Sequence, residues 1–203
     1  FPNYFGEQRF GHDGQNLVKA DRLFVEDNSA SQKSHGHKRN RKLQKQRNAE
    51  GLYISAARSW MFNMLLSQRI LEGNWNQYLR GDVLQLEGSK RWFSSEGESA
   101  ELLAQRVLEQ EVHPTGALFG DGDLPSLSEV KALEQSVMEM FPSWIKGLQQ
   151  RRVMTDRRAL RVVPKNLEWD WFNNNEILDL QMRFTLPAGS YATMLLREVL
   201  LVN

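Results

Sequence analysis

The sequence predicts an α+β fold, with helices in the middle of the chain and strands near its carboxyl end. In residues 51–72, apolar side chains recur every three or four positions, which is the spacing of one helix face. In residues 176–186, apolar and polar side chains alternate, which is the pattern of a strand with one buried face. Because the two periods occupy separate segments, helices and strands are expected to segregate along the chain.

The segment from about residue 50 to 150 is expected to form a mainly helical, acidic unit. The helix over residues 51–72 has a wide apolar arc, which indicates that it is well buried. The elements expected after it are a small hairpin at residues 81–88 and 91–93, a helix from Ser99 to Val112, a loop at residues 113–126, and a helix at residues 129–141 with Ser128 as its N-cap.

The last third of the chain is expected to contain strands at residues 158–163, 168–172 and 176–186, and then a helix from Ser190, its N-cap, to about Leu201. Pro187 and Gly189 separate the last strand from this helix. A strand, a glycine-containing turn and a helix N-terminus present unpaired backbone amides, which suits contact with a phosphate or a ribose. An ordinary strand-to-helix junction has the same pattern, so both interpretations stay open.

The composition excludes several classes of protein. The chain has 203 residues, of which 40% are apolar, and it has no cysteine, so disulfides, thiolate zinc sites and cysteine nucleophiles are excluded for these residues. The longest apolar stretch, residues 59–68, is far shorter than the roughly 20 residues that span a bilayer. His35 and His37 lack a third ligand nearby, so no metal is predicted. The chain opens without Met or a signal sequence, so we expect a piece of a longer polypeptide.

The net charge of +1 conceals an uneven distribution. Residues 1–60 carry 11 Lys+Arg and 6 Asp+Glu, residues 61–150 carry 7 and 13, and residues 151–203 carry 8 and 6. The strongest basic segment is residues 31–47, with Lys33, Lys38, Arg39, Arg41, Lys42, Lys45 and Arg47 and no acid. It is interpreted either as an arm that contacts phosphates or as a solvated linker.

The first eleven residues gather side chains that suit RNA. The segment PNYFGEQRFG combines aromatic rings, glycines, amides and an arginine, namely Tyr4, Phe5 and Phe10, Gly6 and Gly11, Asn3 and Gln8, and Arg9. Aromatic faces stack on an extruded base, and Arg and Asn bond to phosphates and base edges. A turn with aromatic side chains in the core would have the same composition, so both interpretations stay open.

Two motifs resemble the TruD family of tRNA pseudouridine synthases. Residues 2–11 match the pattern PNYFGxQRFG at every specified position, and residues 186–200, LPAGSYATMLLREVL, resemble the carboxyl-terminal LPxGSxAT…RE block. Between them, TGALFGDGD at residues 115–123 and the run RALRVVPKNLEWDWF also resemble the family. The similarity covers essentially the whole chain, and both end motifs are long and specific.

The resemblance implies part of a mixed-sheet pseudouridine-synthase catalytic domain that carries a mainly helical insertion domain. Residues 1–30 and 158–203 would belong to the catalytic domain, and residues 31–157 would form the insertion, beginning with the basic arm at residues 31–47. The resemblance also implies a cytoplasmic enzyme that is monomeric when complete. Its partners would be tRNA and the N-terminal remainder of the same protein, with no membrane.

The activity implied by the resemblance is the isomerisation of a tRNA uridine, uridine 13, to pseudouridine without cofactor or metal. In the family the catalytic Asp lies in a GxKDxxA-type motif upstream of PNYFG, so this chain is expected to lack it and to be inactive alone. Asp156, in MTDRRA, imitates that motif but lacks the preceding Gly and Lys, and it is interpreted as a structural acid that leads into a strand. The alternative function is a non-catalytic RNA-binding module on the same scaffold.

The resemblance also assigns candidate site residues. Phe5 would lie against the target base and Asn3 would line the same pocket, with Gln8 and Arg9 as supports and Gly189 and Ser190 at the border of the cleft. Turn or cap chemistry is the alternative role for each of them. The residues expected to contact the RNA backbone are Lys38, Arg39, Arg41, Lys42 and Lys45.

Overall fold

The computed structural model describes residues 1–26, 41–174 and 177–200. Two short 3-10 turns, η1 (Glu7–Arg9) and η2 (His12–Gly14), follow the first residues. The helices are α1 (Gln15–Glu26), α2 (Arg41–Leu71), α3 (Ala100–Leu108), α4 (Ser128–Met140), α5 (Pro142–Gln150) and α6 (Ala192–Val199). The strands are β1 (Val83–Leu86), β2 (Trp92–Ser94), β3 (Val112–Leu118), β4 (Asp156–Ala159), β5 (Lys165–Asn174) and β6 (Ile177–Thr185).

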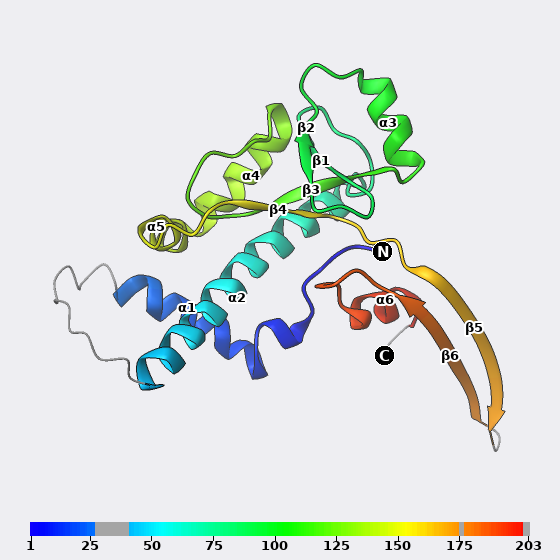
Figure 1. The fold of residues 1–203 in the computed structure, drawn as a ribbon, viewed down its shortest axis with the longest axis horizontal. Helices are drawn as coiled ribbons and strands as arrows, with labels where there is room; N and C mark the ends of the chain where they lie inside the picture. Colours follow the sequence, from blue (N-terminus) through cyan, green and yellow to red (C-terminus); the bar gives the residue numbers. More distant parts are fainter. Residues whose placement is uncertain (27–40, 175–176, 201–203) are drawn as a thin grey trace.

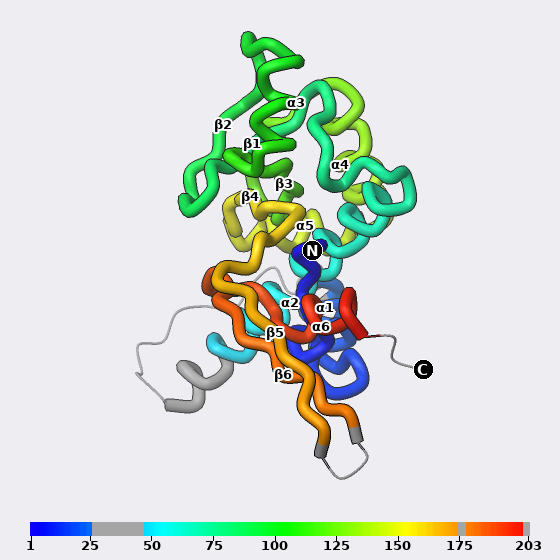
Figure 2. Tube along the Cα trace, turned by 90° about the vertical axis from the view of Figure 1, so that its right-hand side faces the viewer, coloured from blue at the N-terminus to red at the C-terminus, as the bar shows by residue number. Residues whose placement is uncertain are grey.

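The strands form two separate antiparallel sheets (Figure 1). The first has the order β2-β1-β3-β4, with α3 and α4 beside it, and the second is the two-stranded ribbon β5-β6. In Figure 2 the first sheet and its helices lie at one end of the molecule and the ribbon at the other, with the N-terminus between them. The mixture of helices and antiparallel sheets confirms the predicted α+β class.

The long helix α2 packs against α1, α4 and β3. The periodic segment 51–72 is helical as predicted, although the helix begins at Arg41. One face of α2 contributes Ala57, Met61 and Leu65 to a core shared with α1 and α5. The adjoining positions contribute to a second core, which consists of Phe5, Phe10, Ala56, Phe62, Leu66 and Leu160. This second core joins both ends of the chain to α2, across both predicted domain boundaries.

The predicted loop at residues 113–126 is wrong in its first part, because β3 occupies Val112–Leu118 and α3 ends at Leu108. Pro114 and Gly116 favour a loop in the sequence but fit this strand. The Pro114 carbonyl accepts a bond from the Leu160 amide at 2.8 Å. A Cβ on Gly116 would lie 2.8–3.1 Å from side-chain atoms of Leu65, Leu160 and Phe62, so only glycine fits there without displacement.

The predicted N-caps also differ from the structure. Leu127 is the N-cap of α4, and Ser128 is its first residue. Tyr191 is the N-cap of α6, and neither helix has a side-chain cap bond. The backbone amide of Ser190 instead donates to the Pro187 carbonyl at 3.1 Å, so this serine closes a turn before the helix.

Two ion pairs are buried within the helical unit. Arg69 of α2 contacts Asp82, before β1, at 2.9 Å, and Arg157 of β4 contacts Glu134 of α4 at 2.7 Å. All four side chains are at most 1% exposed. A buried charge is tolerated only when it is paired. These contacts therefore hold α2 against the segment before β1, and α4 against β4.

His113 of β3 links the two sheets through a chain of polar contacts. Its Nδ1 accepts a bond from Arg161 Nε at 2.8 Å, and since an arginine cannot accept, Nε2 must carry the proton that is donated to Glu87 at 2.7 Å. Glu87 also contacts Lys165 of β5 at 3.0 Å. Burial lowers the pKa of His113; the hydrogen bond to Glu87 raises it in part and Arg161 lowers it further, so the net effect favours the neutral ring.

Stability should therefore fall as the pH drops below 6.5, the ordinary pKa of histidine. In that range the unfolded chain binds a proton at His113 that the folded chain binds less well, which costs up to about 1.4 kcal/mol per pH unit. Urea midpoints measured between pH 7.5 and 5 test this expectation. His113→Gln should flatten the dependence, whereas His12→Gln, at an exposed side chain, should not. An unchanged slope in His113→Gln would contradict this assignment.

The β5-β6 ribbon carries an exposed apolar face. Trp169 and Trp171 of β5 pair with Met182 and Leu180 of β6, and the two tryptophans are 60% and 58% exposed. Leu178, at the end of the same face, is 63% exposed. The strand at residues 176–186 was predicted correctly, but the expected burial of its apolar side is wrong for Leu178 among the residues that the structure describes.

Candidate functional site

The first residues lie beside the segment that follows β4. The Phe1 amino group donates to the Val162 carbonyl and the Val162 amide donates to the Phe1 carbonyl, both at 2.9 Å. The Asn3 amide donates to the Leu160 carbonyl at 2.8 Å, and the Asn3 side chain donates to the Ala159 carbonyl at 2.8 Å. The two predicted catalytic-domain segments are thus in direct contact.

Asn63 of α2 holds the backbone of Phe5. Its Oδ1 accepts from the Phe5 amide at 2.9 Å, and its Nδ2 donates to the Phe5 carbonyl at 3.0 Å. The adjacent Tyr4 hydroxyl bonds to Ser67 at 2.9 Å, one helical turn further along α2. Asn63, which interrupts the apolar stretch of α2, therefore fixes the backbone of Phe5, the residue predicted to contact the base.

The Phe5 ring is almost covered, because its residue is 7% exposed. Phe62 and Tyr191 meet the ring edge-on, with centroid distances of 5.6 and 6.0 Å. The Arg158 guanidinium carbon lies 4.0 Å from the ring centroid, which is within cation–π range. A second aromatic ring can therefore stack on that face only if Arg158 moves.

Arg158 of β4 joins three segments of the chain at this point. Its Nη2 donates to Asn3 Oδ1 at 2.6 Å and to the Gly189 carbonyl at 3.0 Å, and its Nε donates to the Asn3 carbonyl at 3.2 Å. Burial lowers the pKa of Arg158 to about 10; Tyr191 raises it and Arg9 lowers it further. Among the described residues, no carboxylate forms an ion pair with Arg158.

Arg9 is a second cation beside the same ring. Its guanidinium carbon is 5.3 Å from the Phe5 centroid, its Nε donates to the Tyr191 hydroxyl at 3.0 Å, and its Nη1 donates to Ser55 at 3.1 Å. Within the described ranges, Arg9 also forms no ion pair with a carboxylate. Two arginines around one aromatic ring without acidic partners create a positive site that suits an anion.

The remaining candidates lie at the edge of this cluster. Gln8, on η1, is exposed, and Ser190 is half-buried in the turn before α6. Gly189 has a φ of 90°, which favours glycine, and its carbonyl faces Arg158. A Cβ on Gly6 would lie 2.9 Å from the Tyr191 ring, so the motif needs glycine there for close packing. The structure thus joins Asn3, Phe5, Arg9 and Gly189, while Gln8 and Ser190 are peripheral.

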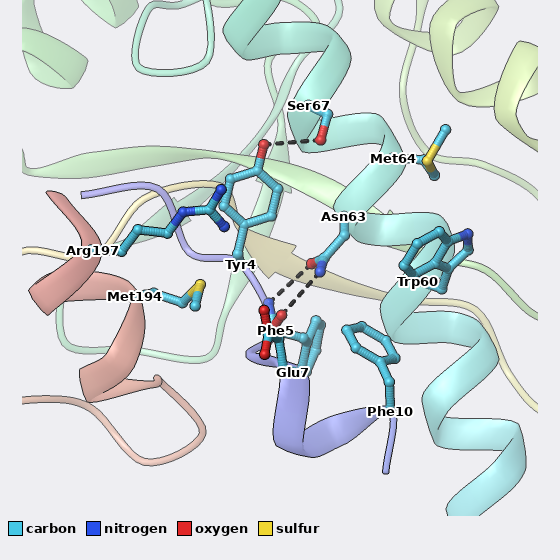
Figure 3. A pocket seen from close by; sticks show the side chains of 10 residues that line it. All are labelled: Tyr4, Phe5, Glu7, Phe10, Trp60, Asn63, Met64, Ser67, Met194 and Arg197. Carbon is cyan, nitrogen blue, oxygen red and sulfur yellow. Dashed lines mark hydrogen bonds between the residues drawn. The ribbon is translucent and has the colours of Figure 1, made fainter. Parts of the chain in front are cut away.

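A pocket of about 300 Å³ adjoins Phe5 between α2 and α6. Figure 3 shows Tyr4 and Phe5 on one wall, a stripe of α2 side chains on another, and two α6 residues opposite. The lining residues are Tyr4, Phe5, Glu7, Phe10, Trp60, Asn63, Met64, Ser67, Met194 and Arg197. Aromatic and methionine side chains accept a planar apolar face, and Glu7 and Arg197 add charge.

Several predicted residues have no described side-chain geometry. Lys38 and Arg39, with His35 and His37, lie outside the described residues, and Arg41, Lys42 and Lys45 lie at the start of α2, where the side chains are not described. Asp156 begins β4, and its carboxylate accepts from the Arg157 amide at 2.8 Å. In the described part of the chain, no three His, Asp or Glu side chains are grouped to hold a metal ion. No helix in that part is long and apolar enough to span a bilayer.

Sequence reasoning missed three residues of this cluster, Arg158, Asn63 and Tyr191. Arg158 was noted only beside Asp156, and its partners Asn3 and Gly189 are 155 and 31 residues away. Asn63 carried a usable signal, because an amide within an apolar helical stretch must find a partner when it is buried. Tyr191 lies inside the carboxyl-terminal motif, next to Ser190, and no spacing rule singles it out.

Comparisons with known proteins agree with these motifs. The chain is 48% identical over 198 residues to the tRNA pseudouridine synthase D of Hydrogenovibrio crunogenus, and 40% identical over 198 residues to that of Nitrosococcus oceani. Each alignment covers 98% of this chain but 52% and 51% of the relative, so the chain spans about half the length of the curated relatives it matches.

A solved structure supports the fold. A crystal structure from Methanosarcina mazei, described as a candidate tRNA pseudouridine synthase D, matches with a TM-score of 0.70 at 18% identity, over 97% of this chain and 60% of that one. The model of the family described as tRNA pseudouridine synthase D (TruD) matches residues 31–199. The chain therefore belongs to the TruD family of tRNA pseudouridine synthases.

Proposed function

We propose that the protein containing this chain isomerises a uridine of tRNA, uridine 13, to pseudouridine, as a cytoplasmic monomer. The observation that carries the proposal is the contact between the two end motifs, in which Arg158 joins Asn3 and Phe5 to Gly189. Residues from motifs more than 170 positions apart thus form one positively charged, aromatic site. The curated relatives named tRNA pseudouridine synthase D support the same activity.

The geometry supports a role for each of these residues. The reaction breaks the bond between C1′ and N1 of the uridine, forms a bond between C1′ and C5, and releases the C5 proton. Because Phe5 is a wall of the pocket in Figure 3, the proposal places the target base there, against the accessible edge of the ring. Arg9 and Arg158 attract the adjoining phosphates. Both polar groups of the Asn3 side chain are already bonded, so Asn3 shapes the site.

The catalytic Asp is proposed to lie outside these 203 residues, as the resemblance implies, with tRNA and the remainder of the polypeptide as partners. The same resemblance supports the division into residues 1–30, 31–157 and 158–203. The bond that the Asp156 carboxylate accepts from the Arg157 amide supports its interpretation as a structural acid at the start of β4. Residues 1–203 alone should therefore bind tRNA without turning it over.

Release of tritium from tRNA labelled at uridine C5 measures the reaction directly, because the C5 proton is lost. We expect release by the full-length protein and none by residues 1–203 alone. Turnover by residues 1–203 would refute the upstream position of the Asp. If the full-length protein bound tRNA without releasing tritium, the alternative of a non-catalytic RNA-binding module would be correct.

Neutralising the basic arm should weaken tRNA binding and its salt dependence. A variant with Lys38, Arg39, Arg41 and Lys42 changed to glutamine should lower the slope of log K against log salt by about 3, because each phosphate contact contributes about 0.7–0.9. Filter binding at 50–300 mM salt measures that slope. Lys131→Gln with Lys146→Gln, on α4 and α5 of the acidic unit, is the control and should change it little. An unchanged slope in the arm variant would favour the solvated-linker interpretation.

A further inference from the structure

Two neighbouring arginines of β4 face opposite sides of the strand. Arg157 is buried and bonds to the Thr115 hydroxyl and carbonyl at 2.9 and 2.7 Å, beside Glu134. Arg158 lies on the other face, above Phe5. Successive side chains of a strand alternate between its faces, so β4 presents one arginine to the buried ion pair and the next to the candidate site.

The contacts of Arg158 use the shape of its guanidinium. Two donors bond to Asn3, one of them also to Gly189, while the guanidinium carbon lies over the Phe5 ring, 4.0 Å from its centroid. A planar fork can bond along its edge and stack on its face at once, whereas a lysine ammonium is a compact charge that can do only one of these. Arginine is therefore the residue type that can hold both neighbours of Tyr4 together.

Charge alone does not account for this arginine. Its pKa is lowered to about 10 by burial, so the surroundings disfavour the cation. Its acceptors within the described ranges are uncharged oxygens of Asn3 and Gly189, without a carboxylate. Arg158 is half-buried despite the cost of desolvating its charge, and its donors point at the site. The directions of its hydrogen bonds, more than its charge, therefore account for its presence.

We propose that Arg158 is a positioning residue for the isomerisation, which fixes Asn3 and the Phe5 ring against Gly189 and thereby sets the surface that receives the target base. This inference rests on the proposed function. Arg158 acts through Phe5 and Asn3, not on the reacting atoms.

Arg158→Lys in the full-length protein tests the role, with Arg161→Lys as the matched control. Arg161 is also half-buried, but it bonds to His113 and to the carbonyls of Asn76, Val107 and Val112, away from Phe5. We expect Arg158→Lys to lower kcat about a hundredfold, because small displacements at a reacting site cost that much, with KM for tRNA changed less than threefold. Arg161→Lys should lower the thermal midpoint but leave kcat within about threefold.

Two outcomes would overturn the proposal. Arg158→Lys with near-normal kcat would show that charge suffices, and an equal loss of kcat in Arg161→Lys would show a general effect of stability.

A readout that needs no activity separates this inference from the proposed function. Hydrogen exchange of the Asn3 side-chain amide, followed by NMR, should be about tenfold faster in Arg158→Lys, because a side chain that loses the Arg158 bond to Oδ1 can leave the Ala159 carbonyl to which its Nδ2 protons bond. It should be unchanged in Arg161→Lys. If the wild-type protein does not isomerise tRNA, the proposed function fails while this measurement still decides whether Arg158 fixes Asn3. Equal exchange in wild type and Arg158→Lys would reject the contact itself.

Discussion

Replacing Asp82 by asparagine should destabilise the chain by about 3–5 kcal/mol, because Arg69 would remain buried without its counter-charge. The Arg69 side chain is 1% exposed, and Asp82 accepts two of its bonds and one from the Leu79 amide. Burial raises the pKa of Asp82, and the Arg69 guanidinium at 2.9 Å and the Leu79 amide oppose this rise because they favour the carboxylate. Urea unfolding should show a lower midpoint with a similar m-value.

The control for this change is an exposed pair. Arg106 contacts Glu111 at 3.1 Å, with side chains 28% and 55% exposed. Glu111→Gln should cost no more than about 1 kcal/mol, since exposed ion pairs contribute little. If Asp82→Asn lowered the free energy of unfolding no more than Glu111→Gln, the prediction would be wrong, and the buried Arg69 charge would not depend on Asp82.

Replacing Phe5 by leucine in the full-length protein should lower kcat for tRNA by about a hundredfold while tRNA affinity changes little. Leucine keeps much of the buried volume but removes the ring edge that adjoins the pocket and the face under Arg158. The loss falls on the placement of the base, whereas affinity comes mainly from phosphate contacts. Tritium release and filter binding on the same preparation measure the two quantities.

Phe24→Leu is the matched control for this variant. Phe24 is fully buried in the other core, against α5, and takes no part in the candidate site. It should lower stability at least as much as Phe5→Leu without a comparable loss of kcat. Equal losses in tRNA binding and turnover for Phe5→Leu would instead support the RNA-binding alternative, in which Phe5 contributes affinity alone.

Long segments with a clear period were predictable from the sequence. The helix over residues 51–72 and the strand at residues 177–185 are both present in the structure. Each has apolar side chains along one continuous face, and this gives the sequence a clear period. β3 was missed, since Pro114 and Gly116 break strands in general, and only the packed neighbours of Gly116 explain its place here. The conformation of this segment depends on tertiary contacts, which the spacing of residues in the sequence does not reveal.

Some residues of the candidate site could be predicted from the sequence, and others could not. The motif residues Asn3, Phe5, Arg9 and Gly189 were named from resemblance, and the structure brings them together. Arg158, which joins them, was not predicted, because its role depends on which face of β4 it occupies. A strand of four residues is too short for its alternation to be read without the neighbouring strand.

The two arginines of β4 also constrain how the chain length can evolve. Arg157 and Arg158 are paired opposite Ala117 and Gly116 of β3, so a shift of one residue would exchange their faces. That shift would direct Arg157 away from Glu134 and direct Arg158 into the space that Thr115 and Glu134 line. A single-residue insertion or deletion in residues 151–155, between α5 and β4, would therefore disrupt both arrangements at once if it shifted the register of β4.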